Sequence, residues 1–225
     1  MIPAFITFEG IDGCGKSTQL RMLASVLRLR QLEVVSTREP GGTPLGQKLR
    51  YALLEAEGQV DPLAELLLYA ADRAQHVRAL VRPALASNHI VLSDRYADAT
   101  VAYQGAGRGF EPTLIQEVVN LATGGLKPDL TLLFDLSVAE AGERASRRTH
   151  NGRPGDRIDS EDPAFHERVR QAYLQIAAAE PERFRVIDSA VSVEETHTLV
   201  LDIVLPFLES RGERSVISKI SDTNL

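Results

Sequence analysis

In the segment Gly10-Ile11-Asp12-Gly13-Cys14-Gly15-Lys16-Ser17, two glycines bracket four residues, and a lysine and a serine come directly after the second glycine. An apolar run at residues 4–9 precedes the first glycine, and Leu20, Leu23 and Leu27 follow at helical spacing. A glycine-rich turn between a buried strand and a helix brings successive backbone N–H groups and the positive end of the helix dipole to one place. The segment therefore predicts a phosphate-binding P-loop.

The P-loop also predicts how a nucleoside triphosphate is held. Lys16 would reach the β- and γ-phosphates, and the Ser17 hydroxyl would bind Mg²⁺. Helix capping is the alternative role of Ser17. The residues expected to surround ATP here are Gly10, Ile11, Asp12, Gly13, Cys14, Gly15, Lys16, Ser17 and Thr18.

Beyond the P-loop, short β-branched or aromatic runs alternate with longer stretches of helical period. Strands are expected at residues 4–9, 34–38, 89–94, 130–135 and 185–187, and helices at 17–30, 45–56, 62–86 and 193–208. This alternation predicts an α/β P-loop NTPase fold, in which helices cover both faces of a five-stranded parallel sheet. We expect one domain over residues 1–211 and a polar tail at residues 212–225, because Gly212 interrupts the last helical pattern.

Composition limits the kinds of partner. The 225 residues carry a net charge of −6, so no overall positive field exists to gather nucleic acid or an anionic membrane. The apolar start at residues 1–8 is too short for a membrane span and lacks a basic leader. Cys14 is the only cysteine, which fits a reducing compartment; it is either a small residue in a tight loop or a reactive thiol. We expect a cytoplasmic protein without nucleic-acid or membrane partners.

A second anion site is indicated at the ends of two predicted strands. Asp94 and Arg95 follow the third strand, and Arg38 ends the second. Open α/β sheets bind ligands at this carboxyl edge, where a carboxylate organises Mg²⁺ and a guanidinium binds phosphate oxygens in pairs. A surface salt bridge between the neighbours Asp94 and Arg95 is the alternative. Two arginines from adjacent strand ends predict a second phosphate site.

Residues 144–159 form a segment dense in arginine and interrupted by Asn151-Gly152 and Pro154-Gly155. This lid segment is expected to be a mobile surface loop, because its composition cannot form a core. A solvated connection is one reading. Basic groups so concentrated in an acidic chain favour the other, an anionic partner.

The P-loop alone leaves GTPases, ATPases and kinases open. No asparagine in the chain is followed by lysine, which argues against the Asn-Lys-x-Asp guanine reader of a GTPase. A regulatory P-loop module with slow ATP turnover, or a kinase for another nucleoside monophosphate, stays possible on the residues alone.

Taken together and in order, several segments resemble bacterial thymidylate kinases over nearly the whole chain. They are residues 8–17, Arg38-Glu39-Pro40-Gly41-Gly42-Thr43, residues 66–73, Asp94-Arg95-Tyr96, Ala102-Tyr103-Gln104-Gly105 and Asp156-Arg157-Ile158. The resemblance implies phosphorylation of dTMP to dTDP with ATP and Mg²⁺, by a homodimer.

The resemblance also assigns roles to the acceptor side. It implies that Tyr69 stacks on thymine, that Arg73 binds a base carbonyl and that Asp12 contacts the 3′-hydroxyl of the sugar. Core packing for Tyr69 and an exposed charge for Arg73 are the alternatives. The remaining acceptor residues implied by the resemblance are Arg38 and Arg95 for the phosphate, and Thr100, Tyr103 and Gln104 for the base and deoxyribose.

Family members carry the arginine that stabilises the transferring phosphoryl group either in the P-loop or in the lid. Position 13 is glycine here, so the resemblance points to the lid type. The catalytic residues expected are Lys16, Asp12 and Arg95, with Arg147, Arg148, Arg153 or Arg157 as the lid arginine. By the same resemblance, Arg144 stacks on adenine.

Overall fold

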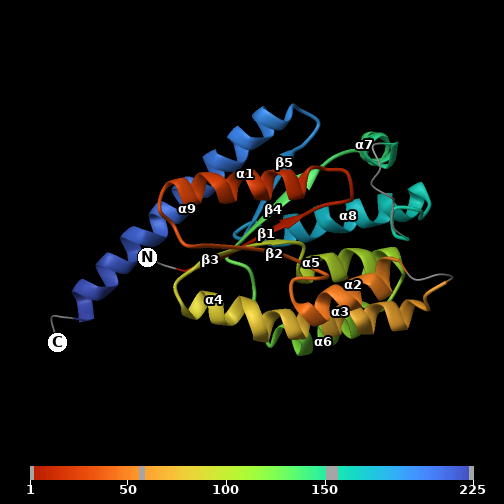
Figure 1. Ribbon diagram of the computed structural model, residues 1–225, viewed down its shortest axis with the longest axis horizontal. Coiled ribbons are helices and arrows are strands. Elements are labelled where there is room, and N and C mark those ends of the chain that lie inside the picture. Colours follow the sequence, from red (N-terminus) through yellow and green to blue (C-terminus); the bar gives the residue numbers. More distant parts are fainter. Residues whose placement is uncertain (1–2, 56–58, 151–156, 223–225) are drawn as a thin grey trace.

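Five parallel strands form a single sheet in a computed structural model that describes residues 3–55, 59–150 and 157–222. The strand order is β2-β3-β1-β4-β5, which confirms the predicted parallel sheet (Figure 1). The strands are β1 (Ala4–Glu9), β2 (Val34–Arg38), β3 (Ile90–Asp94), β4 (Leu130–Asp135) and β5 (Phe184–Asp188). Because β1 lies at the centre, the P-loop that follows it opens at the middle of the carboxyl edge.

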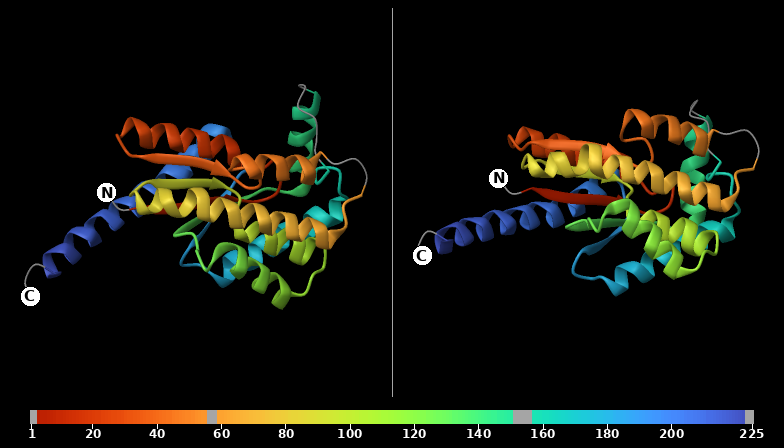
Figure 2. Two further views of the ribbon diagram at one scale, coloured as in Figure 1. Left: turned by 60° about the horizontal axis from the view of Figure 1, so that its bottom comes forward. Right: turned by 90° about the horizontal axis from the view of Figure 1, so that it is seen from below.

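Helices cover both faces of this sheet, as Figures 1 and 2 show. Helices α1 and α9 pack on one face, and α4 and α8 pack on the other, where α3 and α6 form a further layer. The elements in chain order are α1 (Lys16–Leu29), α2 (Pro44–Leu54), α3 (Pro62–His76), the π-helix η1 (Val77–Val81), α4 (Arg82–Ala86), α5 (Ala97–Thr100), the π-helix η2 (Val101–Gly107), α6 (Pro112–Thr123), α7 (Val138–His150), α8 (Pro163–Ala179) and α9 (Val193–Asp222).

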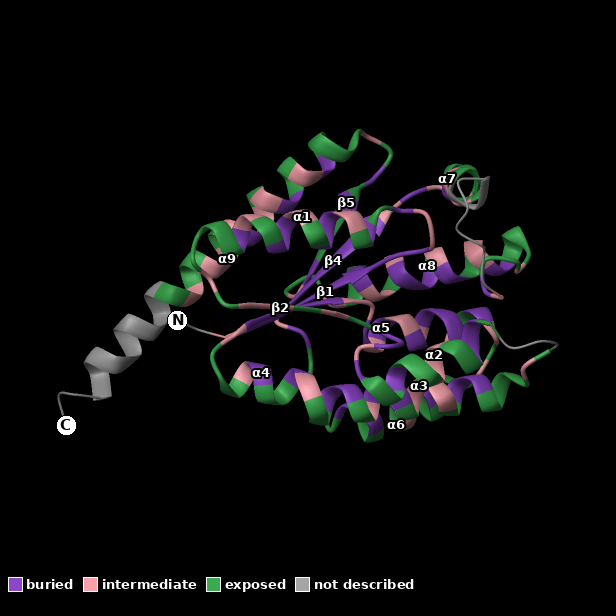
Figure 3. Ribbon diagram, viewed as in Figure 1, coloured by how far each residue is buried: buried purple, intermediate pink, exposed green. Residues whose placement is uncertain are grey.

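The core lies between the sheet and its helices (Figure 3). Leu20, Leu23 and Leu27 are all buried, which confirms the stripe predicted for the first helix. On the sheet, the rings of Phe8 and Phe134 stack with their centroids 5.7 Å apart. Burial on both faces explains why β1 and β4 are almost wholly apolar.

The helix predicted for residues 62–86 forms, but with a change of pitch. The π-helical turn η1 separates α3 from α4, and Pro83 is the second residue of α4. Proline has no N–H and its ring clashes with the carbonyl four residues back, so a regular α-helix cannot pass through this point unchanged.

Two predicted boundaries were wrong. The lid segment is not a loop throughout, since α7 extends to His150; its Ala-, Glu- and Arg-rich sequence favours helix, and Glu143 pairs with Arg147 one turn later at 3.4 Å. At the other end, α9 continues through Gly212 to Asp222. A glycine inside a helix destabilises it by only about 0.5–1 kcal/mol, which does not end this one.

Within the described chain, no helix is long and apolar enough to span a bilayer.

A single acidic side chain is buried at the end of the central strand. The Glu9 carboxylate accepts hydrogen bonds from Tyr96 N at 2.7 Å and from Tyr173 Oη at 2.7 Å. Burial, reinforced by the nearby charge of Asp98, raises the pKa of Glu9 from 4.5 to about 7 against the opposing effect of Arg95. The folded protein therefore holds this proton more tightly than the unfolded chain does.

This difference predicts a pH-dependent stability. The contribution of Glu9 is fully present below its unfolded pKa of 4.5 and is lost as the pH rises through about 7. Its size is on the order of 3 kcal/mol. Glu9→Gln stays neutral at every pH, so its Tm should fall less than that of the wild type between pH 5 and pH 8.

The measurement is thermal unfolding across that pH range, with Glu33→Gln as the control because Glu33 is exposed. The control should follow the wild-type slope. Equal slopes for the wild type and Glu9→Gln would show that Glu9 titrates alike in the folded and unfolded chains.

Candidate active site

The P-loop leaves the start of α1 open to an anion. Gly15, at the N-cap, has φ of 99°, and no side chain caps the helix. The Lys16 ammonium folds back to donate to Gly10 O and Ile11 O, at 2.8 Å each. The first N–H groups of α1 and the Lys16 charge therefore face the same small volume, as a phosphate site requires.

Gly13 shows why this P-loop carries no arginine. Its φ is +93°, and a Cβ at this position would lie 2.4 Å from the Ala141 carbonyl oxygen at the start of α7. A larger residue would meet both the strained backbone and a neighbouring main chain. This position of the P-loop therefore has no room for a long side chain.

The two predicted metal ligands lie together. The Ser17 hydroxyl, in the first turn of α1, donates a hydrogen bond to Asp94 Oδ2 at the end of β3. Ser17 is thus paired with a carboxylate and does not act as the helix cap. A hydroxyl and a carboxylate are oxygen donors of the kind that Mg²⁺ accepts beside phosphate oxygens and waters, so the residues present fit this ion.

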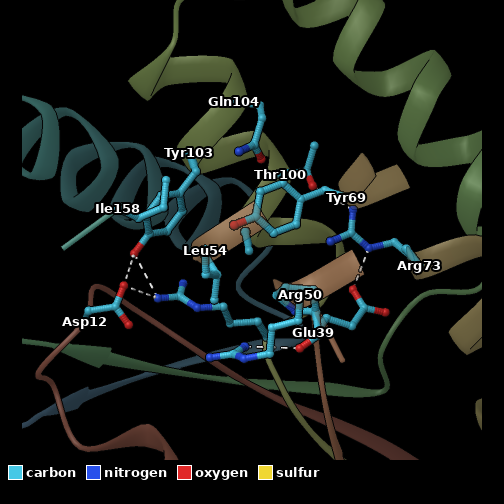
Figure 4. Close-up of a pocket in the computed structure, with 13 residues that line it drawn as sticks. Asp12, Glu39, Arg50, Leu54, Tyr69, Arg73, Thr100, Tyr103, Gln104 and Ile158 are labelled. Atoms are coloured by element: carbon cyan, nitrogen blue, oxygen red, sulfur yellow. Dashed lines mark hydrogen bonds and ion pairs between the residues drawn. The ribbon is translucent and has the colours of Figure 1, made fainter. Parts of the chain in front are cut away.

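A pocket opens on the side of the P-loop that faces α3 and η2 (Figure 4). We call it the inner pocket. Asp12 and Tyr103 lie at one end of it, and Tyr69 and Arg73 lie at the other. Its lining residues are Asp12, Glu39, Pro40, Arg50, Leu54, Tyr69, Arg73, Arg95, Ala99, Thr100, Tyr103, Gln104 and Ile158.

Arg73 is a buried, fixed cation and not an exposed charge. Its guanidinium donates to Glu39 Oε2 at 2.7 Å, to Thr100 Oγ1 at 2.7 Å and to Tyr96 O at 2.8 Å. Glu39 lies also 2.7 Å from His76 Nδ1. Burial raises the pKa of Glu39, but Arg73 and His76 more than reverse this, so its pKa falls below the ordinary value. The anionic Glu39 holds the Arg73 side chain against the pocket wall.

A second arginine is fixed at the opposite end of the pocket. Arg95 Nη2 donates to Asp12 Oδ2 at 2.8 Å and to Tyr103 Oη at 2.9 Å, and Tyr103 donates to Asp12 Oδ2 at 3.2 Å. Burial raises the pKa of Asp12, but the charges of Arg95 and Lys16 outweigh it and hold the pKa well below the usual range. Asp12 is therefore an anionic hydrogen-bond acceptor between the P-loop and the inner pocket.

Of the two arginines predicted to hold a phosphate, Arg95 lines the inner pocket and Arg38 does not. In the sheet register Arg38 lies opposite Asp94, as expected, but its side chain is exposed and does not line the inner pocket. Arg50 of α2 lines the pocket instead and donates to Pro40 O at 3.1 Å. Sequence reasoning missed Arg50 because no motif marks it; only the fold of the 39–44 loop brings α2 to this site.

A second pocket lies on the other side of the P-loop, and we call it the P-loop pocket. Arg144 of α7, for which a contact with adenine was predicted, lines it. Val191, Ser192 and Val193, at the start of α9, also line it and were not expected. Gln19 Nε2 of α1 donates a hydrogen bond to Val193 O at 2.8 Å. Its lining residues are Gly13, Cys14, Gly15, Thr18, Gln19, Arg144, Val191, Ser192, Val193 and Thr196.

The lid arginines separate into different environments. Arg147 is exposed and its guanidinium lies 3.4 Å from Glu143. Arg157 contacts Glu65 of α3 and Leu53 O of α2. Arg153 and the side chain of Arg148 lie outside the described residues.

Comparison with known proteins identifies the family. A family model described as thymidylate kinase matches residues 8–200. A thymidylate kinase of Gloeobacter violaceus is 50% identical over 210 residues, which cover 93% of this chain and 98% of that protein. One from Geotalea uraniireducens is 49% identical over 205 residues, covering 89% and 96% respectively.

A solved structure agrees with these sequences. The crystal structure of thymidylate kinase from Ehrlichia chaffeensis superimposes with a TM-score of 0.74 at 33% identity, covering 91% of this chain and all of that one. Fold, P-loop and sequence thus lead to one assignment: the chain belongs to the thymidylate kinase family.

Proposed function

We propose that this chain transfers the γ-phosphoryl group of ATP to dTMP across the P-loop, which is a wall of both pockets. The carrying observation is that Asp12 lines the inner pocket, whereas its neighbours Gly13 and Cys14 line the P-loop pocket. The family carries out ATP-dependent phosphorylation of dTMP to dTDP. Two nucleotides meeting end to end at residues 12–13 would satisfy the in-line geometry of that reaction.

Thymidine would occupy the inner pocket. The Tyr69 ring offers a flat apolar surface for the base, and Arg73 offers guanidinium donors to its carbonyl oxygens. Asp12 would accept a hydrogen bond from the 3′-hydroxyl, with Tyr103 beside it. Thr100 and Gln104 complete the wall, and both are buried.

The dTMP phosphate would lie between Arg50 and Arg95. Both side chains line the inner pocket, and Arg95 is already oriented by Asp12. The contact with Asp12 restricts the Arg95 side chain, so less rotamer freedom is lost when the phosphate binds. Burial of Arg95 would lower its pKa, but Asp12 and the surrounding groups raise it well above the ordinary value, so the charge is kept.

ATP would lie in the P-loop pocket with its phosphates at the start of α1. Lys16 would turn from the Gly10 and Ile11 carbonyls to the β- and γ-phosphates. Ser17 and Asp94 would hold Mg²⁺, which neutralises charge on the phosphate chain when bound. Arg144 would stack on adenine, opposite residues 191–193. One of the four lid arginines, Arg147, Arg148, Arg153 and Arg157, would neutralise charge on the transferring group.

We also propose a homodimer built on α3 and α6. These two helices pack side by side and leave four large leucines exposed. Leu63 and Leu67 lie on α3, and Leu114 and Leu121 lie on α6. Apolar side chains gathered on neighbouring helices are typical of a subunit interface.

We place the enzyme in the cytoplasm, since its one cysteine, Cys14, is buried and free.

The test of the reaction is ADP release with ATP, Mg²⁺ and each nucleoside monophosphate in turn. We predict the highest kcat/KM for dTMP. Loss of the thymine methyl group from an apolar pocket should lower kcat/KM for dUMP by about 10- to 200-fold without abolishing it. ADP release that does not depend on any monophosphate would instead indicate an ATPase.

A second prediction concerns the phosphate clamp. Losing a charge-assisted hydrogen bond to phosphate removes about 1.5–3 kcal/mol, so Arg50→Ala should raise KM for dTMP by about tenfold or more. Arg38→Ala should change this KM much less, because Arg38 lies outside the inner pocket. Steady-state kinetics with varied dTMP measures both values. A larger rise in KM for Arg38→Ala than for Arg50→Ala would place the phosphate at the end of β2 and contradict the proposed site.

A further inference from the structure

Glu65 joins three parts of the chain through one carboxylate. It lies in the first turn of α3, and its side chain is 0% exposed. Gln104 Nε2 donates to it at 2.8 Å, Arg108 donates through Nε at 3.2 Å and Nη2 at 3.0 Å, and Arg157 donates through Nη2. The carboxylate is thus fully satisfied by side chains from η2, its C-terminal end and the end of the lid segment.

Arg157 is turned toward α2 and α3. Besides Glu65, its Nε donates to Leu53 O at 3.1 Å, and its backbone N–H donates to Leu54 O at 3.3 Å. Its neighbour Ile158 is 4% exposed and lines the inner pocket together with Leu54. Holding Arg157 in place therefore also holds Ile158 in the pocket wall.

Glu65 is also connected to the inner pocket through Gln104 and through Tyr69. Gln104, which donates to Glu65, itself lines the inner pocket. Tyr69 lies one helical turn after Glu65 on α3, on the same face. Arg108, which donates to Glu65, also forms an ion pair with Glu161, from Nη1 to Oε1 at 2.7 Å. This ion pair fixes the segment that follows Ile158.

Glu65 stays charged in this setting. Burial raises its pKa, but the hydrogen bonds from Arg108, Gln104 and Arg157 outweigh burial and bring the pKa below the ordinary value. A buried carboxylate is stable only while its hydrogen-bond donors remain, so small changes in Glu65 or in Arg157 should disturb the whole arrangement.

We propose that Glu65 and Arg157 are a pair of positioning residues for the dTMP pocket: their contact fixes Ile158 and Gln104 as its wall. The inference rests on the proposed function of the inner pocket. It removes Arg157 from the four candidates for the arginine that stabilises the transferring phosphoryl group and leaves Arg147, Arg148 and Arg153.

Arg157→Lys, Glu65→Gln and the double variant test this pair. Arg157 reaches Leu53 O through Nε and Glu65 through Nη2, whereas lysine keeps the positive charge but carries all its donors on one nitrogen. Glutamine keeps the shape of Glu65 without its charge. Each single variant should raise KM for dTMP by about fivefold or more, while KM for ATP and kcat change by less than about threefold. In the double variant, KM for dTMP should rise about as much as in the more affected single variant, because the two residues act as a unit.

Arg78→Lys is the matched control, since Arg78 is exposed on η1 and donates to Ala74 O one turn earlier. It should leave all three constants unchanged. Thermal unfolding of each variant, with and without dTMP, separates loss of fold from loss of ligand binding: the variants should unfold cooperatively and gain less Tm from dTMP than the wild type.

Two results would overturn the proposal. A fall in kcat of about 100-fold or more for Arg157→Lys, with KM for dTMP unchanged, would place Arg157 at the transferring phosphate. Independent, additive effects of the two substitutions on KM would show that they do not act as a pair. Failure of the proposed function looks different, because then the wild type itself would release no ADP in response to dTMP.

Discussion

The turn from β1 into α1 must present bare backbone N–H groups to an anion, and the rest of the site follows from that constraint. Gly13 and Gly15 adopt positive φ, and no side chain caps α1. The Ala141 carbonyl lies so close to Gly13 that the turn cannot carry its own arginine. The arginine that we propose for the transferring group would therefore come from outside this turn, while Asp12 lines the inner pocket.

Three arginines on the acceptor side share one construction, in which the guanidinium is held by a carboxylate. Glu39 holds Arg73, Asp12 holds Arg95, and Glu65 holds Arg157. In a chain of net charge −6, these pairs concentrate positive groups around one pocket without a global positive field. Buried pairs of this kind are weak evidence for stability, but they fix orientation, and orientation is what phosphoryl transfer needs.

Sequence reasoning predicted what depends on local spacing. The P-loop, the five strands and the burial pattern of α1 follow from residues close together in the chain. Arg50 and the Glu65–Arg157 contact could not be read this way. Arg157 meets Glu65 only because the chain returns to α3 after 92 residues, and no periodicity records that. Helix propensity also decided α7, where composition had suggested a loop.

The central claim is that two nucleotides meet at the P-loop, one from each pocket. The most direct measurement is a crystal structure with adenosine and thymidine joined by an oligophosphate chain. We predict thymine between Tyr69 and Arg73, the 3′-hydroxyl at Asp12 and the phosphates running from Arg95 past Lys16 to the start of α1. A thymidine half bound outside the inner pocket, with Asp12 and Arg95 still paired beside an empty cleft, would contradict the account.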